Sequence, residues 1–184
     1  SNLCHMPGVT AVQSSQYGAH TAGYAVDGDM STFNHTNSTG SPSWLEIDLS
    51  SVYSLNQIVL HNRTDATNGR RLSNFRLSVL DADDNELAGE DFHTETGTWA
   101  GASVTWNLPE AVQARKIRIQ QLGTNGHGNY YLHIKEVEAY LQSEFSGETP
   151  VIIDARYTHT LPDEPNDTDN NSLPDDWQEE TGLI

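Results

Sequence analysis

Short runs of β-branched and aromatic residues recur through the first 143 positions of this 184-residue chain, each closed by a cluster of Gly, Asn, Asp or Ser. This punctuation leaves no helical period longer than three turns. Residues 75–79 and 117–120 alternate apolar with polar side chains, as strands with one buried face do. The pattern predicts an all-β antiparallel sandwich or jelly roll. Its expected strands are residues 44–49, 57–61, 74–80, 103–108, 116–122 and 131–140.

The net charge of −17, from nine bases and 26 acids, excludes several partners. Such a chain repels nucleic-acid phosphates and anionic membrane surfaces, and no apolar run is long enough to cross a bilayer. Acidic chains instead suit cations, calcium in particular. No basic and apolar leader segment is seen at the amino terminus.

Charge and composition also divide the chain. Residues 146–184 hold ten acids and one base, and the composition shifts after Ser143. We therefore expect a sandwich domain over residues 1–143, a linker with an apolar anchor strand over 144–161, and an acidic appendage over 162–184. The single cysteine, Cys4, excludes an internal disulfide and a cysteine-built zinc site.

The first candidate site follows the apolar strand at 58–60. Arg63 and Arg70 flank Asp65, and Gly69 allows the loop to turn so that both guanidiniums converge. A pair of arginines can donate to the vicinal hydroxyls and ring oxygen of a neutral sugar. A surface ion-pair cluster is the alternative interpretation.

Two further elements precede it. His35 stands in a polar loop, where a lone histidine is usually just exposed. Residues 24–29 form an Asp-Gly turn that supplies carbonyl and carboxylate oxygens, which a hard cation needs, although an ordinary acidic turn has the same composition.

In this order these residues, with the run Trp-Leu-Glu-Ile-Asp-Leu at 44–49 and Lys-Glu-Val-Glu at 135–138, resemble the F-type lectins, or fucolectins. The family signature is a His followed by Arg-x-Asp, four residues, and Arg or Lys. Here 27 residues separate His35 from Arg63, one more than is usual, and the Arg63-x-Asp65-x4-Arg70 part matches directly. The resemblance covers residues 8–141.

The resemblance implies a jelly roll that binds terminal α-L-fucose between loops at one end, without catalysis. His35, Arg63 and Arg70 would bond the axial 4-hydroxyl, the 3-hydroxyl and the ring oxygen, and Asp65 would orient the arginines. By position, the sugar's methyl group would contact aromatic side chains: Tyr17, His20 and Phe33.

The resemblance also implies a structural calcium ion. Its side-chain ligands would be Asp27 and Glu136, and its remaining oxygens would come from Tyr24, Asp29 and Thr32 or Ser31.

Two departures from the family favour a bacterial member. The adjacent Cys-Cys pair that often stacks on the sugar is absent near residues 66–67, and so are the disulfides of animal members. Glycosylation sequons begin at Asn34, Asn37 and Asn62, and glycans at the first and last would crowd the expected ligands.

The tail resembles the thrombospondin type 3-like calcium repeats of bacterial extracellular proteins. Acidic, amide or carbonyl oxygens fall at the EF-hand spacing, although Gln178 replaces the usual final Glu. The expected ligands are Asp167, Asp169, Asn171, Leu173, Asp175 and Gln178. A disordered acidic linker is the alternative.

Two other functions stay open. A glycosidase would need a facing acid pair such as Asp65 and Asp27, but two arginines beside Asp65 would prevent it from acting as an acid. A discoidin-like module could bind galactose, another glycan or a protein, appended to a larger enzyme or adhesin. We expect an extracellular or cell-surface protein that binds fucosylated glycans, with its oligomeric state open.

Overall fold

The structure, a computed structural model, describes residues 1–65, 67–93 and 101–141. Six strands make one continuous antiparallel arrangement in the order β1-β2-β5-β3-β4, with β6 paired to β2. Their bounds are β1 Thr10–Gln13, β2 Trp44–His61, β3 Phe75–Leu80, β4 Glu86–Phe92, β5 Ser103–Gln121 and β6 Glu136–Leu141. Three short 3-10 helices complete the fold: η1 Leu3–His5, η2 Ala22–Ala25 and η3 Asn68–Arg71.

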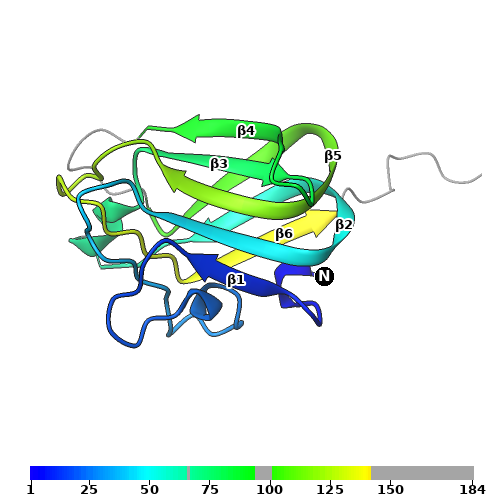
Figure 1. Ribbon diagram of the computed structural model, residues 1–184. Coiled ribbons are helices and arrows are strands. Elements are labelled where there is room, and N and C mark those ends of the chain that lie inside the picture. Colours follow the sequence, from blue (N-terminus) through cyan, green and yellow to red (C-terminus); the bar gives the residue numbers. More distant parts are fainter. Residues whose placement is uncertain (66, 94–100, 142–184) are drawn as a thin grey trace, which may run out of the picture. The chain divides into compact units, whose positions relative to one another are not determined.

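The two longest strands belong to both layers of the sandwich. The first part of β2 pairs with β1 and with the end of β5, whereas its second part pairs with β6 and with the start of β5. The register shifts between Asp48 and Tyr53, where Ser50 has a positive φ of 67°. In Figure 1 the layer from β1 to β4 faces the viewer and β6 crosses behind it. The expected all-β antiparallel sandwich is therefore confirmed.

The expected strands are present, with changes in their bounds. Two pairs of expected strands are each one long strand, β2 and β5, because the chain stays extended across the register shift between the layers. The edge strands β1 and β4 were not expected. The expected strand at 131–140 begins only at Glu136, and the residues before it form a loop.

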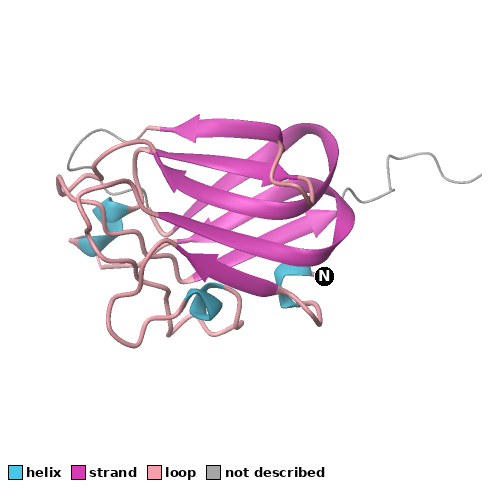
Figure 2. Ribbon diagram, viewed as in Figure 1, coloured by secondary structure: helices cyan, strands magenta, loops and turns pink. Residues whose placement is uncertain are grey.

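The core lies between the layers and comes from the alternation seen in the sequence. Leu45, Ile47 and Leu49 of β2 are fully buried, and so are Ile117 and Ile119 of β5. Each such side chain contributes roughly 1.5–3 kcal/mol by leaving water. The core fixes the strand ends from which the loops leave, and Figure 2 shows those loops gathered at the end of the sheets where η3 lies.

No helix in the described part of the chain has the length and apolar character needed to span a membrane.

Candidate functional site

Two loop segments from distant parts of the chain pair at the loop end. The backbone N–H groups of Asn34 and Thr36 donate to the carbonyls of Ile134 and Leu132, at 3.1 and 3.0 Å. In return, Ile134 N donates to Asn34 Oδ1 at 2.7 Å, and Leu132 N donates to Thr36 Oγ1 at 2.9 Å. The two polar side chains thus act as ladder partners, and this explains why both are fully buried.

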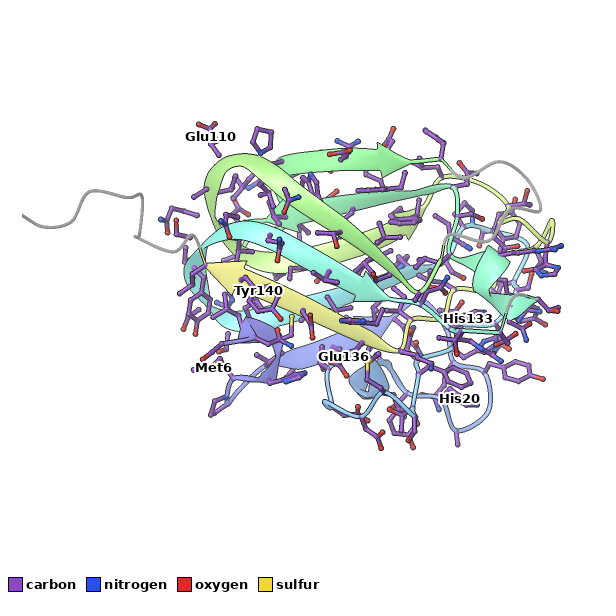
Figure 3. All side chains as sticks on the ribbon, turned by 180° about the vertical axis from the view of Figure 1, so that it is seen from behind. Met6, His20, Glu110, His133, Glu136 and Tyr140 are labelled. Carbon is purple, nitrogen blue, oxygen red and sulfur yellow. The ribbon has the colours of Figure 1, made fainter. Side chains whose placement is uncertain are left out.

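This pairing places His35 directly opposite His133. Opposed residues of an antiparallel pair project from the same face, and the two imidazole centroids lie 5.2 Å apart. His35 is 6% exposed at the surface of the cluster, whereas His133 is fully buried beneath it. Figure 3 shows His20 and His133 on the same side of the molecule, where the loops gather.

Aromatic rings surround His35. The ring centroid of Tyr17, which is 49% exposed, lies 4.7 Å from that of His35. The Tyr131 ring meets His35 edge-on, with centroids 5.2 Å apart. On the other side, His20 stacks on Phe33 with centroids 4.4 Å apart. The structure therefore brings together the three residues expected to contact the methyl group, and adds Tyr131.

Two guanidiniums cover this aromatic cluster. Arg63 lies over the Phe33 ring at 4.5 Å, and Arg71 lies over the Tyr131 ring at 4.7 Å. Cation–π contacts of this kind hold a guanidinium in place without using all of its donors. Asp65 Oδ2 accepts from Arg63 Nε at 3.0 Å, as expected of a residue that orients the arginine.

The second arginine is Arg71 and not Arg70. Arg70 is exposed, and among the described residues only its carbonyl makes a side-chain contact, with Ser73 Oγ at 2.8 Å. The 3-10 turn η3 is fixed by Gly69 N, which donates to the Asp65 carbonyl at 2.8 Å. Burial of Gly69 and Leu72 then turns Arg71 toward the cluster and Arg70 toward solvent. Of the two arginines, the structure thus brings Arg71, and not the expected Arg70, to the cluster.

The His35 ring is neutral and offers one nitrogen as a hydrogen-bond acceptor. Its Nδ1 lies 2.7 Å from the Thr36 carbonyl, which only accepts, so Nδ1 carries the proton and Nε2 has the lone pair in the neutral ring. Burial, and the charges of Arg71 and Arg63, lower the pKa of His35, although the Thr36 hydrogen bond opposes them. The ring is therefore neutral at physiological pH.

Asp65 is a fixed anion. Its desolvation acts to raise its pKa, but the Asn68 N–H bond and the Arg63 guanidinium outweigh that effect, and the pKa lies below its usual value. A carboxylate held in this state supplies charge and orientation and cannot donate a proton.

Three buried polar atoms of the cluster have no hydrogen-bond partner among the described residues. They are Arg71 Nε and both ring nitrogens of His133. Burial, with the nearby charge of Arg63, holds the pKa of His133 well below its ordinary value, so this ring is also neutral. The sequence pattern pointed to neither residue, since Arg71 is hidden beside Arg70 and His133 lies in an apolar run.

The expected calcium ligands meet at a neighbouring corner. The Thr32 hydroxyl donates to Asp27 Oδ2 at 2.8 Å and lies 2.9 Å from the Asp29 carbonyl and 3.5 Å from the Tyr24 carbonyl. Ser31 instead bonds through its backbone N–H to Asp29 Oδ1 at 2.8 Å. The gathered oxygens are those that a hard cation prefers.

Glu136 reaches the same corner from the start of β6. Its Oε2 accepts from Gly28 N at 3.0 Å, and its Oε1 lies 2.9 Å from His5 Nε2. Burial raises the pKa of Glu136, the His5 and Gly28 contacts lower it, and Asp27 raises it further. Gly28 has a φ of +78°, which suits glycine, and an added Cβ would meet the His5 ring at 3.4 Å. The donor set therefore fits a cation, with two carboxylates and several neutral oxygens.

In the described part of the chain no three His, Cys, Asp or Glu side chains gather into a metal-binding group. The expected linker, anchor strand and tail calcium loop lie outside the described residues, as do residues 142 and 143 of the expected sandwich domain.

The cluster as a whole can receive a neutral polyol. A hydroxyl that donates to His35 Nε2 can accept from a guanidinium at the same time, and the surrounding rings offer an apolar surface. Arg71 has no carboxylate partner among the residues that the structure describes, so its donors are not spent on an ion pair.

Known proteins resemble this chain in sequence and in fold. Residues 9–137 match the model of the F5/8 type C domain. Fucolectin-3 of Anguilla japonica is 27% identical over 119 residues, which cover 59% of this chain and 66% of that relative, just under two thirds of its length.

Two solved structures extend the comparison. The lectin domain of Lectinolysin, complexed with Lewis B antigen, is 26% identical with a TM-score of 0.68, over 78% of this chain and 98% of that one. A Streptococcus pneumoniae fucose binding module is 29% identical with a TM-score of 0.64, over 76% and 94%.

Proposed function

The chain belongs to the F5/8 type C domain family, and from this premise we propose that it is a non-catalytic lectin module that binds terminal α-L-fucose on glycans. Relatives named for fucose binding, or solved with a fucosylated antigen, support the proposal. The observation that carries it is the set formed by neutral His35, Arg63 and Arg71 over a wall of aromatic rings, with no carboxylate paired to Arg71 among the described residues.

This set matches the functional groups of fucose. The axial 4-hydroxyl would donate to His35 Nε2 and accept from one guanidinium, while the 3-hydroxyl and ring oxygen accept from the arginine pair. The 6-methyl group would rest on rings of the wall formed by Tyr17, His20 and Phe33. A sugar that lacks the axial hydroxyl would leave buried donors unpaired, and this is the physical basis of selectivity.

A glycosidase would need an acid that can donate a proton, and Asp65, the carboxylate that the described residues bring to Arg63, does not fit that role. Asp65 is held ionised by Asn68 and Arg63, so it cannot serve as the acid of a glycosidase. We therefore propose that the module delivers a larger protein to fucosylated glycans outside the cell. Its bacterial origin remains a prediction.

The test compares two adjacent arginines. We expect Arg71→Ala to weaken fucose binding at least tenfold by calorimetry, which corresponds to about 1.4 kcal/mol. Arg70→Ala, on the exposed side of the same turn, is the matched control and should bind as the unchanged protein does. Equal losses in both variants would refute the assignment of Arg71.

A glycan array tests the ligand class. Preference for glycans that end in α-L-fucose supports the proposal, whereas preference for galactose would assign the discoidin-like alternative. No binding to any fucosylated glycan by the folded protein would refute the proposal.

We further propose that calcium binds the corner formed by Tyr24, Asp27, Asp29, Thr32 and Glu136. The ion would join the loop to β6 and order the cluster beside it, and would take no part in chemistry. We expect added calcium to raise the melting temperature, and a chelator to reverse the rise.

The variant Asp27→Asn should lose that response, because it removes one of the two carboxylates. Asp83→Asn, in the exposed turn between β3 and β4, is the control that should keep the calcium response. A calcium response that Asp27→Asn leaves unchanged would argue against this corner.

A further inference from the structure

Fully buried His133 has no assigned role, although it lies at the centre of the cluster. It is opposed to His35 at 5.2 Å and meets Phe33 edge-on at 6.2 Å. Because no part of the side chain reaches the surface, it cannot contact a sugar in this arrangement. Any role must therefore act through a neighbour.

Leaving a neutral imidazole without partners is costly. One ring nitrogen donates and the other accepts, and neither has a partner among the described residues. An unmade bond of a buried polar group carries a desolvation penalty, so such groups are usually satisfied by protein or by internal water. Phenylalanine or leucine would fill the same space without that penalty.

Arg71 has a buried donor that could pair with an acceptor nitrogen of His133. Its Nε–H is buried and unpartnered within the part of the chain that the structure covers. The Arg71 charge also acts on the His133 ring, together with the charge of Arg63. A donor without an acceptor and an acceptor without a donor thus lie in one cluster, with no direct bond between them.

We propose that His133 is a positioning residue, whose lone pair accepts a hydrogen bond from Arg71 Nε–H through one internal water molecule. The side chain of Arg71 is half-buried, and its guanidinium is repelled by that of Arg63, so the Tyr131 ring alone does not fix its direction. A polar anchor at Nε would hold the other guanidinium nitrogens toward the ligand. A neutral anchor does this without adding a third positive charge.

The proposal deepens the proposed function, on which it rests for its effect on fucose binding, but its first test needs no sugar. Exchange of the Arg71 Nε–H proton with solvent can be followed by ¹H–¹⁵N NMR, with Arg71→Lys to assign the signal. We expect slow exchange in the unchanged protein and exchange at least tenfold faster in His133→Phe. His133→Asn and His133→Gln keep an amide near the level of one or the other ring nitrogen, and we expect at least one of them to restore slow exchange.

The second test measures fucose affinity in the same variants. We expect His133→Phe to lose at least fivefold, and the amide variant that restores slow exchange to recover most of the loss, while melting temperatures show that both remain folded. His93→Phe, which replaces an exposed imidazole, is the control expected to change neither readout.

The outcomes separate the two proposals. Unchanged exchange and unchanged affinity in folded His133→Phe would overturn the role of His133. If the unchanged protein bound no fucose, the proposed function would fail, and the exchange experiment would still decide whether His133 holds Arg71. Should the Phe variant fail to fold, His133→Leu serves in its place.

Discussion

Arg70 and Arg71 follow each other in a 3-10 turn, where successive side chains point about 120° apart. Only one of them can face the cluster, and the burial of Gly69 and Leu72 decides which. The two arginines should therefore be substituted one at a time, because only one of them faces the cluster.

At this scale, the state of the His35 ring predicts how binding depends on pH. The pKa of His35 lies below its usual value of 6.5, mainly through burial. Nε2 therefore keeps its lone pair in most molecules at pH 6.5, and loses it as the pH falls through the lowered pKa. We expect fucose affinity to change little between pH 8 and 7 and to weaken in solutions more acidic than pH 6.5.

Calorimetry across this range checks the prediction. His35→Gln, which keeps an amide acceptor but does not titrate there, should bind more weakly and show a flatter profile. An affinity that increased on acidification would contradict a neutral acceptor.

The sequence predicted most of the cluster and missed the rest for a physical reason. His35, Arg63 and Asp65 were found because their spacing along the chain is itself the signal. Arg71 and His133 were not, because their roles depend on which way a turn faces and on which strand end lies opposite.

Among the structural elements, the pairing of residues 34–36 with 132–134 has the clearest energetic consequence. The Thr36 hydroxyl accepts from Leu132 N and donates to Ser43 Oγ at 3.0 Å. In Thr36→Val the shape is kept but the Leu132 N–H group loses its partner inside the protein, and this should cost about 1–3 kcal/mol of stability.

Denaturant unfolding provides the measurement. Thr39→Val is the matched control, because the Thr39 hydroxyl is exposed and lies 3.3 Å from Ser41 Oγ, and it should change stability by less than about 0.5 kcal/mol. A similar small effect at both positions would mean that the ladder can relax around the missing hydroxyl.

The strands themselves were largely predictable, because alternation reports a buried face wherever the strand borders the core. The strands β1 and β4 were not predicted, because β1 has only four residues and most residues of β4 are polar or small. The union of two expected strands into β2 was also hidden. It depends on Ser50 adopting a positive φ, which its residue type does not signal.

At the scale of the whole molecule, the net charge of −17 does not describe the charge at the candidate site. The bases on the sheet are held by carboxylates, for example Arg115 by Asp48 at 2.8 Å and Arg76 by Glu86 at 2.6 Å. Arg71 stands apart from this network, over an aromatic ring. Among the described residues, the sign of the net charge therefore does not report the local charge at the cluster.

A neutral ligand should not sense that field. We expect the fucose dissociation constant to change less than about twofold between 50 and 500 mM sodium chloride. Over this range the Debye length becomes severalfold shorter. An affinity that fell steeply with salt would instead indicate an anionic ligand, and would redirect the search toward sulfated or carboxylated sugars.

The burial of Asn34 and Asn62 bears on how this protein can be produced. Both asparagines begin sequons, yet both amides lie inside the fold, where Asn34 Nδ2 donates to Gln13 Oε1 and Asn62 Nδ2 to the Gly69 carbonyl. An oligosaccharide transferred to a nascent chain would reach these amides before folding could hide them. A host whose secretory pathway glycosylates asparagine would thus attach sugar where the protein needs a buried hydrogen bond, and the yield of folded protein would depend on a host that lacks this modification.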